Sequence, residues 1–426
     1  MSSSAASLKI LISAYACEPL KGSEPGVGWN MALAVARHHD VWVLTRANNR
    51  KVIEAALPHD SRVLRFVYYD LPATVRWWKR APGGVQLYYY LWQLGAYFVA
   101  RRLHRRLHFD IVHHVTFGKY WVPSFLALLP VPFIWGPVGG GESTPPGFRA
   151  SLSRRGRIAE VLREMARSVA ERDPFVRLTA RRSGIALAKT PETAARLMAL
   201  GAHRVRILSE AGLWPKEVVP SSPCLTDAAH PQRFVSAGQL RDLKGFHLGI
   251  RAFAAAGLSD AEYWIIGDGP SRRYLQTLAT SLGVAERVRF WGWLTRDETL
   301  RRIRESQVLI HPTLHDSGGW VCLEAMAAGR PVICLDLGGP ATQVPLHAGV
   351  RVPARDPEQV VGDLARAMRR LADDTTLRSS MGRAARAHSR AFLWEYKTLL
   401  LDALYREIAH GSRDAPNPSR QIVSAR

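Results

Sequence analysis

The chain is poor in several features, and each scarcity narrows its class. Only four cysteines occur among 426 residues, and no two of them form a C-x-x-C pair. This argues against a disulfide framework and against the common zinc modules, so we expect reduced thiols. The first residues lack a basic segment, and their apolar run is only LKILISA. We therefore expect no secretory signal.

A long apolar run is also missing. One long uncharged stretch, residues 81–100, begins with Ala-Pro-Gly-Gly and contains two glutamines. A membrane-spanning helix needs about 20 predominantly apolar residues, so none is predicted. We expect a cytoplasmic protein, with a peripheral position at the inner face of the cell membrane as an open alternative.

Acidic residues are scarce relative to basic ones, which gives a formal net charge of +22. Residues 1–215 hold 30 basic and 14 acidic residues, a net of +16, whereas residues 216–426 hold 28 and 22, a net of +6. Such a field attracts nucleic acid, anionic lipid or phosphorylated substrates. No P-loop, zinc finger or ribonucleoprotein motif is present, and the basic residues are spread over many helical segments. We therefore predict no nucleic-acid partner.

Short apolar runs alternate with helical patterns along the whole chain, which indicates β-α-β units and parallel sheets. The expected strands are 8–14, 41–45, 63–69, 110–115, 131–135, 185–189, 205–209, 233–237, 262–267, 287–291, 307–311, 331–335 and 349–352. They are too many for one doubly wound sheet. The proline-rich segment 214–231 is typical of a linker. We predict an α/β fold with Rossmann-like domains at 1–215 and 216–390, a helix at 391–410 and a disordered tail at 411–426.

Two basic segments lie in the front half. Residues 76–108 contain RWWKR, YYYLW and RRLHRRLH, and aromatic residues beside basic ones suit an anionic membrane interface. The alternative is a pair of ordinary helices with core aromatics and solvated arginines. Residues 149–182 carry many arginines at helical spacing, which indicates a solvated helix face.

The string from His311 to Val344 is the most informative part of the chain. An expected strand ends there in a loop with Gly318 and Gly319, and Trp320 and Val321 open a helix. Glycines let a backbone approach a ligand, and a helix N-terminus offers free N–H groups to an anion. Because ligands bind beyond the carboxyl ends of strands in such sheets, we expect a phosphate-bearing ligand here.

Two neighbouring loops suit the same ligand. Residues 236–245, SAGQLRDLKG, present Arg241 and Lys244 after a strand, where cations could neutralise a diphosphate. Gly267 ends the next expected strand. Each feature alone is also typical of an ordinary surface turn.

Together these segments resemble the retaining glycosyltransferase family 4, also called glycosyl transferases group 1, of GT-B fold. The resemblance covers residues 8–409 and is strongest over 233–345. The E-x7-E motif of that family corresponds to Asp316 and Glu324, with seven residues between them. The resemblance implies that Glu324 holds the donor ribose and that Asp316, shorter than glutamate by one methylene, lies beside the donor sugar. Glu324 could instead only complement the helix dipole.

The G-R-x4-K-G segment of the family corresponds to residues 238–245. The resemblance implies that Lys244 binds the donor phosphates. Gln239 stands where the family has arginine, and Arg241 could supply the missing charge.

In the front half, Gly22 and Glu24 match the glycine-rich loop that faces the diphosphate. The usual histidine of a later loop is absent. His113 and His114 end an expected strand near the acceptor side, and Glu142 follows another. We therefore name His114 as a candidate contact with a reacting sugar, and His113 and Glu142 as acceptor-side candidates, although each is also an ordinary polar residue in such a place.

The resemblance implies transfer of a sugar, with retention, from a UDP- or GDP-sugar to a glycan or lipid-linked acceptor in surface polysaccharide synthesis. No tightly bound cofactor is expected. The D-x-D pair of metal-dependent glycosyltransferases is absent, so we expect no metal. Lys244, Arg241 and the amides of 318–321 would then stabilise the leaving diphosphate. The helix near Trp394 would cross back to the front domain.

Two other functions stay open. A nucleotide-sugar epimerase could share this fold and would need no acceptor. Because Asp316 and Gln239 depart from the family pattern, a catalytically inactive nucleotide-sugar-binding protein is the second alternative.

Overall fold

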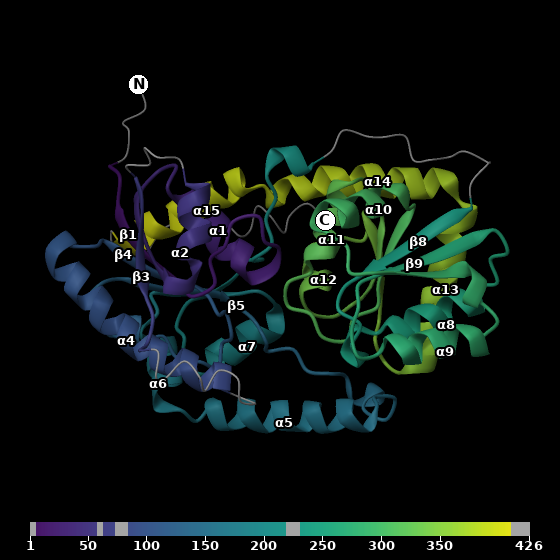
Figure 1. Cartoon of the computed structure of the whole chain (residues 1–426), viewed down its shortest axis with the longest axis horizontal. Coiled ribbons are helices and arrows are strands. Elements are labelled where there is room, and N and C mark those ends of the chain that lie inside the picture. The colour runs from purple at the N-terminus through teal and green to yellow at the C-terminus, as the bar shows by residue number, and fades with distance from the viewer. Residues whose placement is uncertain (1–5, 58–62, 73–83, 219–230, 410–426) are drawn as a thin grey trace.

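The computed structural model describes residues 6–57, 63–72, 84–218 and 231–409, and it contains two parallel sheets side by side (Figure 1). The first has the order β3-β2-β1-β4-β5-β6-β7 and the second the order β10-β9-β8-β11-β12-β13. The predicted pair of Rossmann-like sheets is therefore confirmed. The strands are β1 (Lys9–Ala14), β2 (Asp40–Arg46), β3 (Leu64–Tyr69), β4 (Ile111–Thr116), β5 (Phe133–Val138), β6 (Ile185–Ala188), β7 (Val205–Ile207), β8 (Gln232–Ala237), β9 (Ala261–Ile266), β10 (Val288–Gly292), β11 (Val308–His311), β12 (Val332–Leu335) and β13 (Gly349–Val352).

Helices cover both faces of each sheet and bury their apolar sides there, as doubly wound sheets require. They are α1 (Ser23–Val35), α2 (Arg50–Ala56), α4 (Gly84–Leu107), α5 (Arg154–Ala170), α6 (Pro174–Arg182), α7 (Pro191–Ala199), α8 (Phe246–Ala256), α9 (Arg272–Ser281), α10 (Arg296–Glu305), α11 (Trp320–Ala327), α12 (Gly338–Gln343), α13 (Pro357–Asp373), α14 (Thr375–Ser389) and α15 (Trp394–Ala409). In the second domain α8, α9 and α13 share one core, and α10, α11 and α14 share the other.

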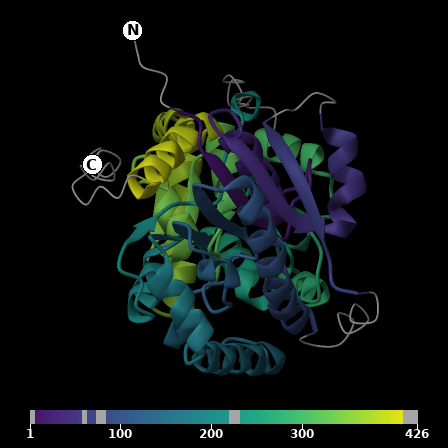
Figure 2. The ribbon, with the colours of Figure 1, turned by 90° about the vertical axis from the view of Figure 1, so that its left-hand side faces the viewer.

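The last helix, α15, lies on the first domain although it follows the second in sequence (Figures 1 and 2). It packs with α1, and the carboxylate of its Glu407 forms an ion pair with Arg206 of β7 at 3.0 Å. The two segments that join the domains run side by side, because the backbones of Leu213 and Leu393 form a parallel bridge. The domains are thus connected by two hydrogen-bonded segments.

A third segment also reaches from the first domain to the second. Phe148 and Leu152, which precede α5, are buried in the core formed by α8, α9 and α13. Ser153 hydrogen-bonds Asp242 in the second domain. The chain then returns to the first domain along α5. Nothing in the sequence pattern predicted this exchange of core residues.

Three large aromatic residues of α4 belong to the core rather than to a surface. Tyr88, Tyr89 and Trp92 are at most 1% exposed and pack with Tyr15. For them the ordinary-helix interpretation is right. The RWWKR segment lies outside the described residues, as do most of the expected linker and the tail.

Candidate active site

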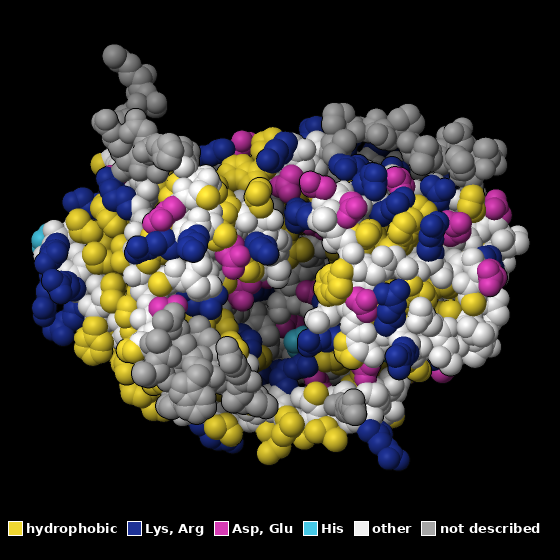
Figure 3. Space-filling view, in the orientation of Figure 1, with side chains coloured by type: hydrophobic (Ala, Val, Ile, Leu, Met, Phe, Trp, Pro, Cys, Tyr) yellow, Lys and Arg dark blue, Asp and Glu magenta, His cyan; other side chains and the backbone are white. Residues whose placement is uncertain are grey.

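A cavity of about 750 Å³ opens between the two domains. Its walls come from segments that follow the carboxyl ends of β1, β4, β5, β6, β7 and β11, and from the inner side of α5. Figure 3 shows the hollow at the centre of the molecule, with basic, acidic and histidine side chains inside it. Strand ends of both sheets thus face one space, where a ligand is expected in this architecture.

The Asp316 carboxylate has polar partners on both of its oxygens. Its carboxylate pairs with Lys244 at 2.7 Å and with the His311 ring at 3.2 Å. Burial works to raise the pKa of Asp316, but the Lys244 charge and the His311 hydrogen bond outweigh it and hold the pKa well below its usual range. Asp316 is therefore a carboxylate, and the structure brings it together with Lys244, another residue that the sequence analysis assigned to the donor site.

The same carboxylate occupies the N-terminus of α11. Its Oδ1 accepts hydrogen bonds from the Gly318 amide at 2.9 Å and the Gly319 amide at 3.2 Å. Gly319 has a φ of 58°, which favours glycine because a side chain there strains the backbone. Two of the amides predicted to bind a phosphate therefore donate to the Asp316 carboxylate at the start of α11.

Glu324 lies behind the cavity wall rather than in it. Its carboxylate pairs with Arg296 at 2.7 Å, and Arg296 also contacts Glu217. Burial raises the pKa of Glu324, and the Arg296 charge offsets part of this effect. Gly22 lies next to the guanidinium group of Arg296, since a Cβ at Gly22 would be 3.5 Å from Arg296 Nη1. The ribose-binding role of Glu324 stays a prediction.

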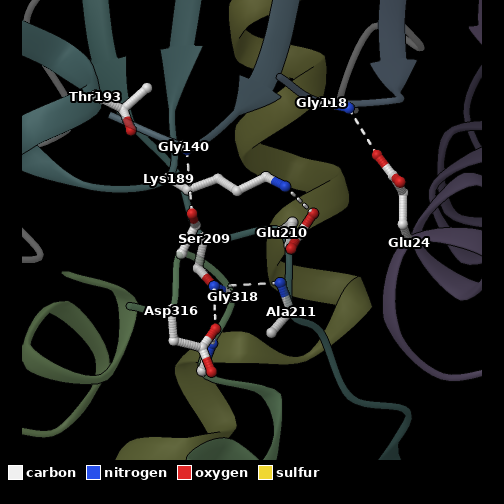
Figure 4. Close-up of polar contacts among 12 residues, drawn as sticks. Glu24, Gly118, Gly140, Lys189, Thr193, Ser209, Glu210, Ala211, Asp316 and Gly318 are labelled. Atoms are coloured by element: carbon white, nitrogen blue, oxygen red, sulfur yellow. Dashed lines mark hydrogen bonds and ion pairs between the residues drawn. The ribbon is translucent and has the colours of Figure 1, made fainter. Parts of the chain in front are cut away.

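Lys189 and Glu210 form a buried ion pair that the sequence analysis did not name (Figure 4). They follow β6 and β7, and both line the cavity. Burial works to lower the pKa of Lys189, but the charge of Glu210 outweighs it and the pKa rises, so the lysine is charged. The signal that could have found them is their place just after strand ends, where ligands bind in such sheets.

A second cationic side chain of the wall, Lys119, follows β4 and was also missed. Its Nζ lies 5.4 Å from the Phe117 ring and 5.8 Å from the Trp121 ring, distances that suit cation–π contact. Burial lowers the pKa of Lys119, and Glu24 partly offsets this. Glu24 itself accepts a hydrogen bond from the Gly118 amide at 2.6 Å and lines the cavity as predicted (Figure 4).

The two domains touch across the site through Glu142. Its carboxylate accepts hydrogen bonds from Ser317 Oγ at 2.7 Å and from Thr190 Oγ1 at 2.6 Å. Its backbone carbonyl lies 3.0 Å from the His315 ring. Glu142 is 4% exposed, and its carboxylate also accepts a hydrogen bond from the Gly140 amide at 3.0 Å. In this conformation it holds the domains together, and no contact with an acceptor is open to it.

The structure corrects the expectation for the two histidines of β4. His113 binds Tyr405 on α15 at 2.7 Å and the Gly136 carbonyl at 2.6 Å. His114 faces Tyr89 at 3.4 Å. Burial lowers the pKa of His113 to about 4 and that of His114 to about 3. Both are neutral core residues, because helices cover both faces of this strand, and neither lines the cavity.

The remaining candidates divide between the cavity and its surroundings. Gly318 and Trp320 line it, whereas Arg241 and Gln239 are exposed and do not. Gly319 and Val321 stand just behind the wall, at the start of α11. Gly267 has a φ of 124° and lets the loops after β8 and β9 approach, since a Cβ there would lie 2.0 Å from the Gly238 carbonyl oxygen.

Comparisons with known proteins agree with this geometry. Residues 227–388 match the sequence model of the family described as glycosyl transferases group 1. Over 201 residues the chain is 33% identical to the lipopolysaccharide core biosynthesis glycosyltransferase LpsE of Rhizobium meliloti (strain 1021), covering 47% of this chain and 56% of that one. The chain spans 30% and 56% of the length of the first two curated relatives.

Solved structures match over nearly the whole chain. Sucrose-phosphate synthase from Thermosynechococcus elongatus has a TM-score of 0.67 at 19% identity, covering 95% of this chain and 100% of that one. Anabaena Alr3699/HepE in complex with UDP and glucose has a TM-score of 0.62 at 16% identity, covering 93% and 99%. The protein therefore has the GT-B architecture, and its residues 227–388 match glycosyl transferases group 1.

Proposed function

We propose that the protein is a glycosyltransferase that binds a nucleotide-sugar in the inter-domain cavity and moves the sugar to an acceptor. The observation that carries this proposal is the meeting of Asp316, Lys244 and the amides before α11 beside the strand-end loops of the other domain. Two comparisons support it: the group 1 match covers this part of the site, and the neighbour HepE is in complex with UDP and glucose.

The donor diphosphate takes the position at the start of α11 that Asp316 fills now. Its oxygens accept hydrogen bonds from the Gly318 and Gly319 amides, since a doubly charged diphosphate competes well with the Asp316 carboxylate for a helix N-terminus. Asp316 then turns to the sugar hydroxyls. Lys119, which lines the cavity, and Lys244, freed from part of its pairing with Asp316, balance the phosphate charge.

The reaction breaks the bond between the sugar carbon and the diphosphate oxygen. Negative charge develops on the departing diphosphate, and the lysines and amides stabilise it. The acceptor hydroxyl forms the new bond and gives its proton to the diphosphate. Closing the domains excludes water, which protects the donor from hydrolysis. Membership of family 4, retention, the absence of a metal requirement and the UDP or GDP identity of the donor stay predictions.

The acceptor is a glycan or a lipid-linked glycan, and the pathway is surface polysaccharide synthesis at the cytoplasmic side of the membrane. The relative LpsE supports this assignment, because its name places it in lipopolysaccharide core biosynthesis.

The test combines binding with turnover. We expect a UDP- or GDP-sugar to raise the unfolding temperature, because a ligand that binds the folded state stabilises it. Nucleoside diphosphate release should depend on acceptor and persist in EDTA, and NMR of the product reports the anomeric configuration. Asp316→Asn and Lys244→Met should each lower turnover about 100-fold or more.

Asp336→Asn is the matched control, because this half-exposed carboxylate pairs with Arg351 away from the cavity. Donor conversion without acceptor would favour the epimerase. Binding without turnover on any acceptor would favour the inactive binding protein. The absence of any nucleotide-sugar effect on the unfolding temperature would overturn the proposal.

A further inference from the structure

Helix α5 turns its apolar side toward solvent. Ile158, Val161, Leu162, Met165 and Val169 are 55–69% exposed. Their spacing of three and four residues places them on one face of the helix. In two perpendicular views α5 forms the lower edge of the molecule, and hydrophobic side chains gather on that edge (Figures 1, 2 and 3).

The opposite face of α5 is polar and faces the protein. Glu160 is 4% exposed and accepts a hydrogen bond from Thr144 Oγ1 at 2.9 Å. Arg167 is 6% exposed and donates to the Glu142 carbonyl at 3.1 Å. Arg163 lines the cavity. A surface helix ordinarily buries its apolar face. Here the buried charges fix the reverse orientation, so the apolar face is left for a partner.

The charge around this face is positive. Arg154 and Arg157 are exposed at the start of α5, and Arg172 is exposed just beyond its end. Residues 149–182 contain ten arginines and only four acidic residues. An apolar stripe flanked by cations is complementary to a lipid leaflet with anionic headgroups, where the stripe meets acyl chains and the arginines meet phosphates.

A second copy of the chain fits this face less well. Antiparallel pairing of two α5 helices would bring Arg154 of one toward Arg172 of the other, and like charges repel.

Within the described ranges, no helix is both long enough and apolar enough to cross a bilayer. Helix α5 has 17 residues with five arginines, a composition that suits a position in the plane of the interface.

We infer that α5 docks flat on an anionic membrane surface, with its apolar stripe at the acyl boundary and its polar face toward the cavity. The cavity then opens beside the lipid surface, through a wall that includes Arg163 and Ala166. Where the proposed function holds, this position gives the site access to a lipid-linked acceptor. The docking itself does not depend on that function.

Vesicle flotation tests the inference with the full chain. The protein should float with vesicles of equal parts phosphatidylcholine and phosphatidylglycerol, bind phosphatidylcholine vesicles weakly, and detach at high salt. Leu162→Glu combined with Met165→Glu should lower the binding constant about tenfold or more, because two apolar side chains leave the interface. Both positions are exposed, so the fold should persist.

Leu346→Glu combined with Leu399→Glu is the matched control. These residues are 64% and 57% exposed, lie outside α5, and give the same change of charge. A second pair of variants isolates the cations: Arg154→Gln, Arg157→Gln and Arg172→Gln together should weaken binding, whereas Arg273→Gln, Arg370→Gln and Arg383→Gln together should change it less.

Three results would overturn the inference. The wild-type protein could fail to float with anionic vesicles. The α5 variants could bind as well as their controls. Sedimentation could show a wild-type dimer, without vesicle binding, that the α5 variants convert to a monomer. Because flotation uses no nucleotide-sugar, a failure here is separate from a failure of the proposed function.

Discussion

At the residue scale, the partner of each of two buried lysines determines the direction of its pKa shift. Lys189 has Glu210 beside it and stays charged. Lys397 on α15 is equally enclosed, but its Nζ donates to the backbone carbonyl of Ser209. Burial lowers the pKa of Lys397 to about 7, although the Glu210 charge opposes the shift. A carbonyl does not compensate the loss of water around an ammonium group as a carboxylate does.

This shift predicts a pH-dependent stability. The folded pKa of Lys397 lies below its usual value of 10.5. Between pH 7 and that value the unfolded chain therefore binds more protons, and the stability rises with pH by up to about 1.4 kcal/mol per unit. Lys397→Met should remove this part of the slope. Chemical denaturation at several pH values measures it.

Lys51→Met is the control, because Lys51 is exposed and should leave the slope unchanged. Parallel pH profiles for the wild type and Lys397→Met would contradict the assignment of a lowered pKa to Lys397.

The sequence predicted part of the site at this scale. Asp316, Lys244 and Glu24 were found because each follows a strand in a recognisable local motif, and strand ends converge in this fold. His113 and His114 satisfied the same rule yet are core residues, because Tyr405, 292 positions from His113, closes over the strand. Contacts between such distant segments leave no local pattern in the sequence.

At the element scale, short segments outside the sheets determine how the domains join. Strands were predicted closely, since burial on both sheet faces produces continuous apolar runs. The last helix was also predicted, at 391–410 against the observed Trp394–Ala409. The packing of the segment before α5 was not predicted, because the sequence around Phe148 and Leu152 does not indicate which of the two domain cores they join. The inverted polarity of α5 was also unforeseen, since its arginines suggested only a solvated face.

Phe148 should therefore stabilise the second domain although it belongs to the first half of the chain. Phe148→Ala leaves a cavity in the core of α8, α9 and α13 and should cost about 3–5 kcal/mol of unfolding free energy. Hydrogen exchange should accelerate first at the amides of β8 and β9. Denaturant unfolding and exchange mass spectrometry measure the two effects.

Phe98→Ala makes the same chemical change at a side chain that is 59% exposed, so it should cost much less. If both variants lost equal stability, or if exchange rose only in the first domain, the placement of Phe148 would be disproved.

At the scale of the whole molecule, hydrogen bonds across the cavity hold the domains in contact. Ser317 Oγ donates to Glu142 at 2.7 Å and accepts from the Gly140 amide at 3.1 Å. A hydrogen bond to a charged group contributes about 1.5–3 kcal/mol. This contact is large enough to shift a balance between open and closed arrangements, which commonly differ by a few kcal/mol.

Ser317→Ala should therefore favour an open arrangement of the domains. Small-angle scattering of the unliganded variant should give a larger radius of gyration than that of the wild type, and a nucleoside diphosphate should reduce the difference. Ser281→Ala is the control, because that hydroxyl donates to the Leu278 carbonyl in its own helix. Identical scattering curves would show that Ser317 does not set the arrangement.

The insertion of Phe148 and Leu152 into the neighbouring core has a consequence for chimeric proteins. In a recombinant that joins the first half of this chain to the second half of a relative, Phe148 and Leu152 would have to pack in a core formed by different residues. Residues 145–153 should therefore be taken from the same parent protein as the second half, although they lie within the first half of the sequence. Crossover points chosen at the linker alone would miss this requirement.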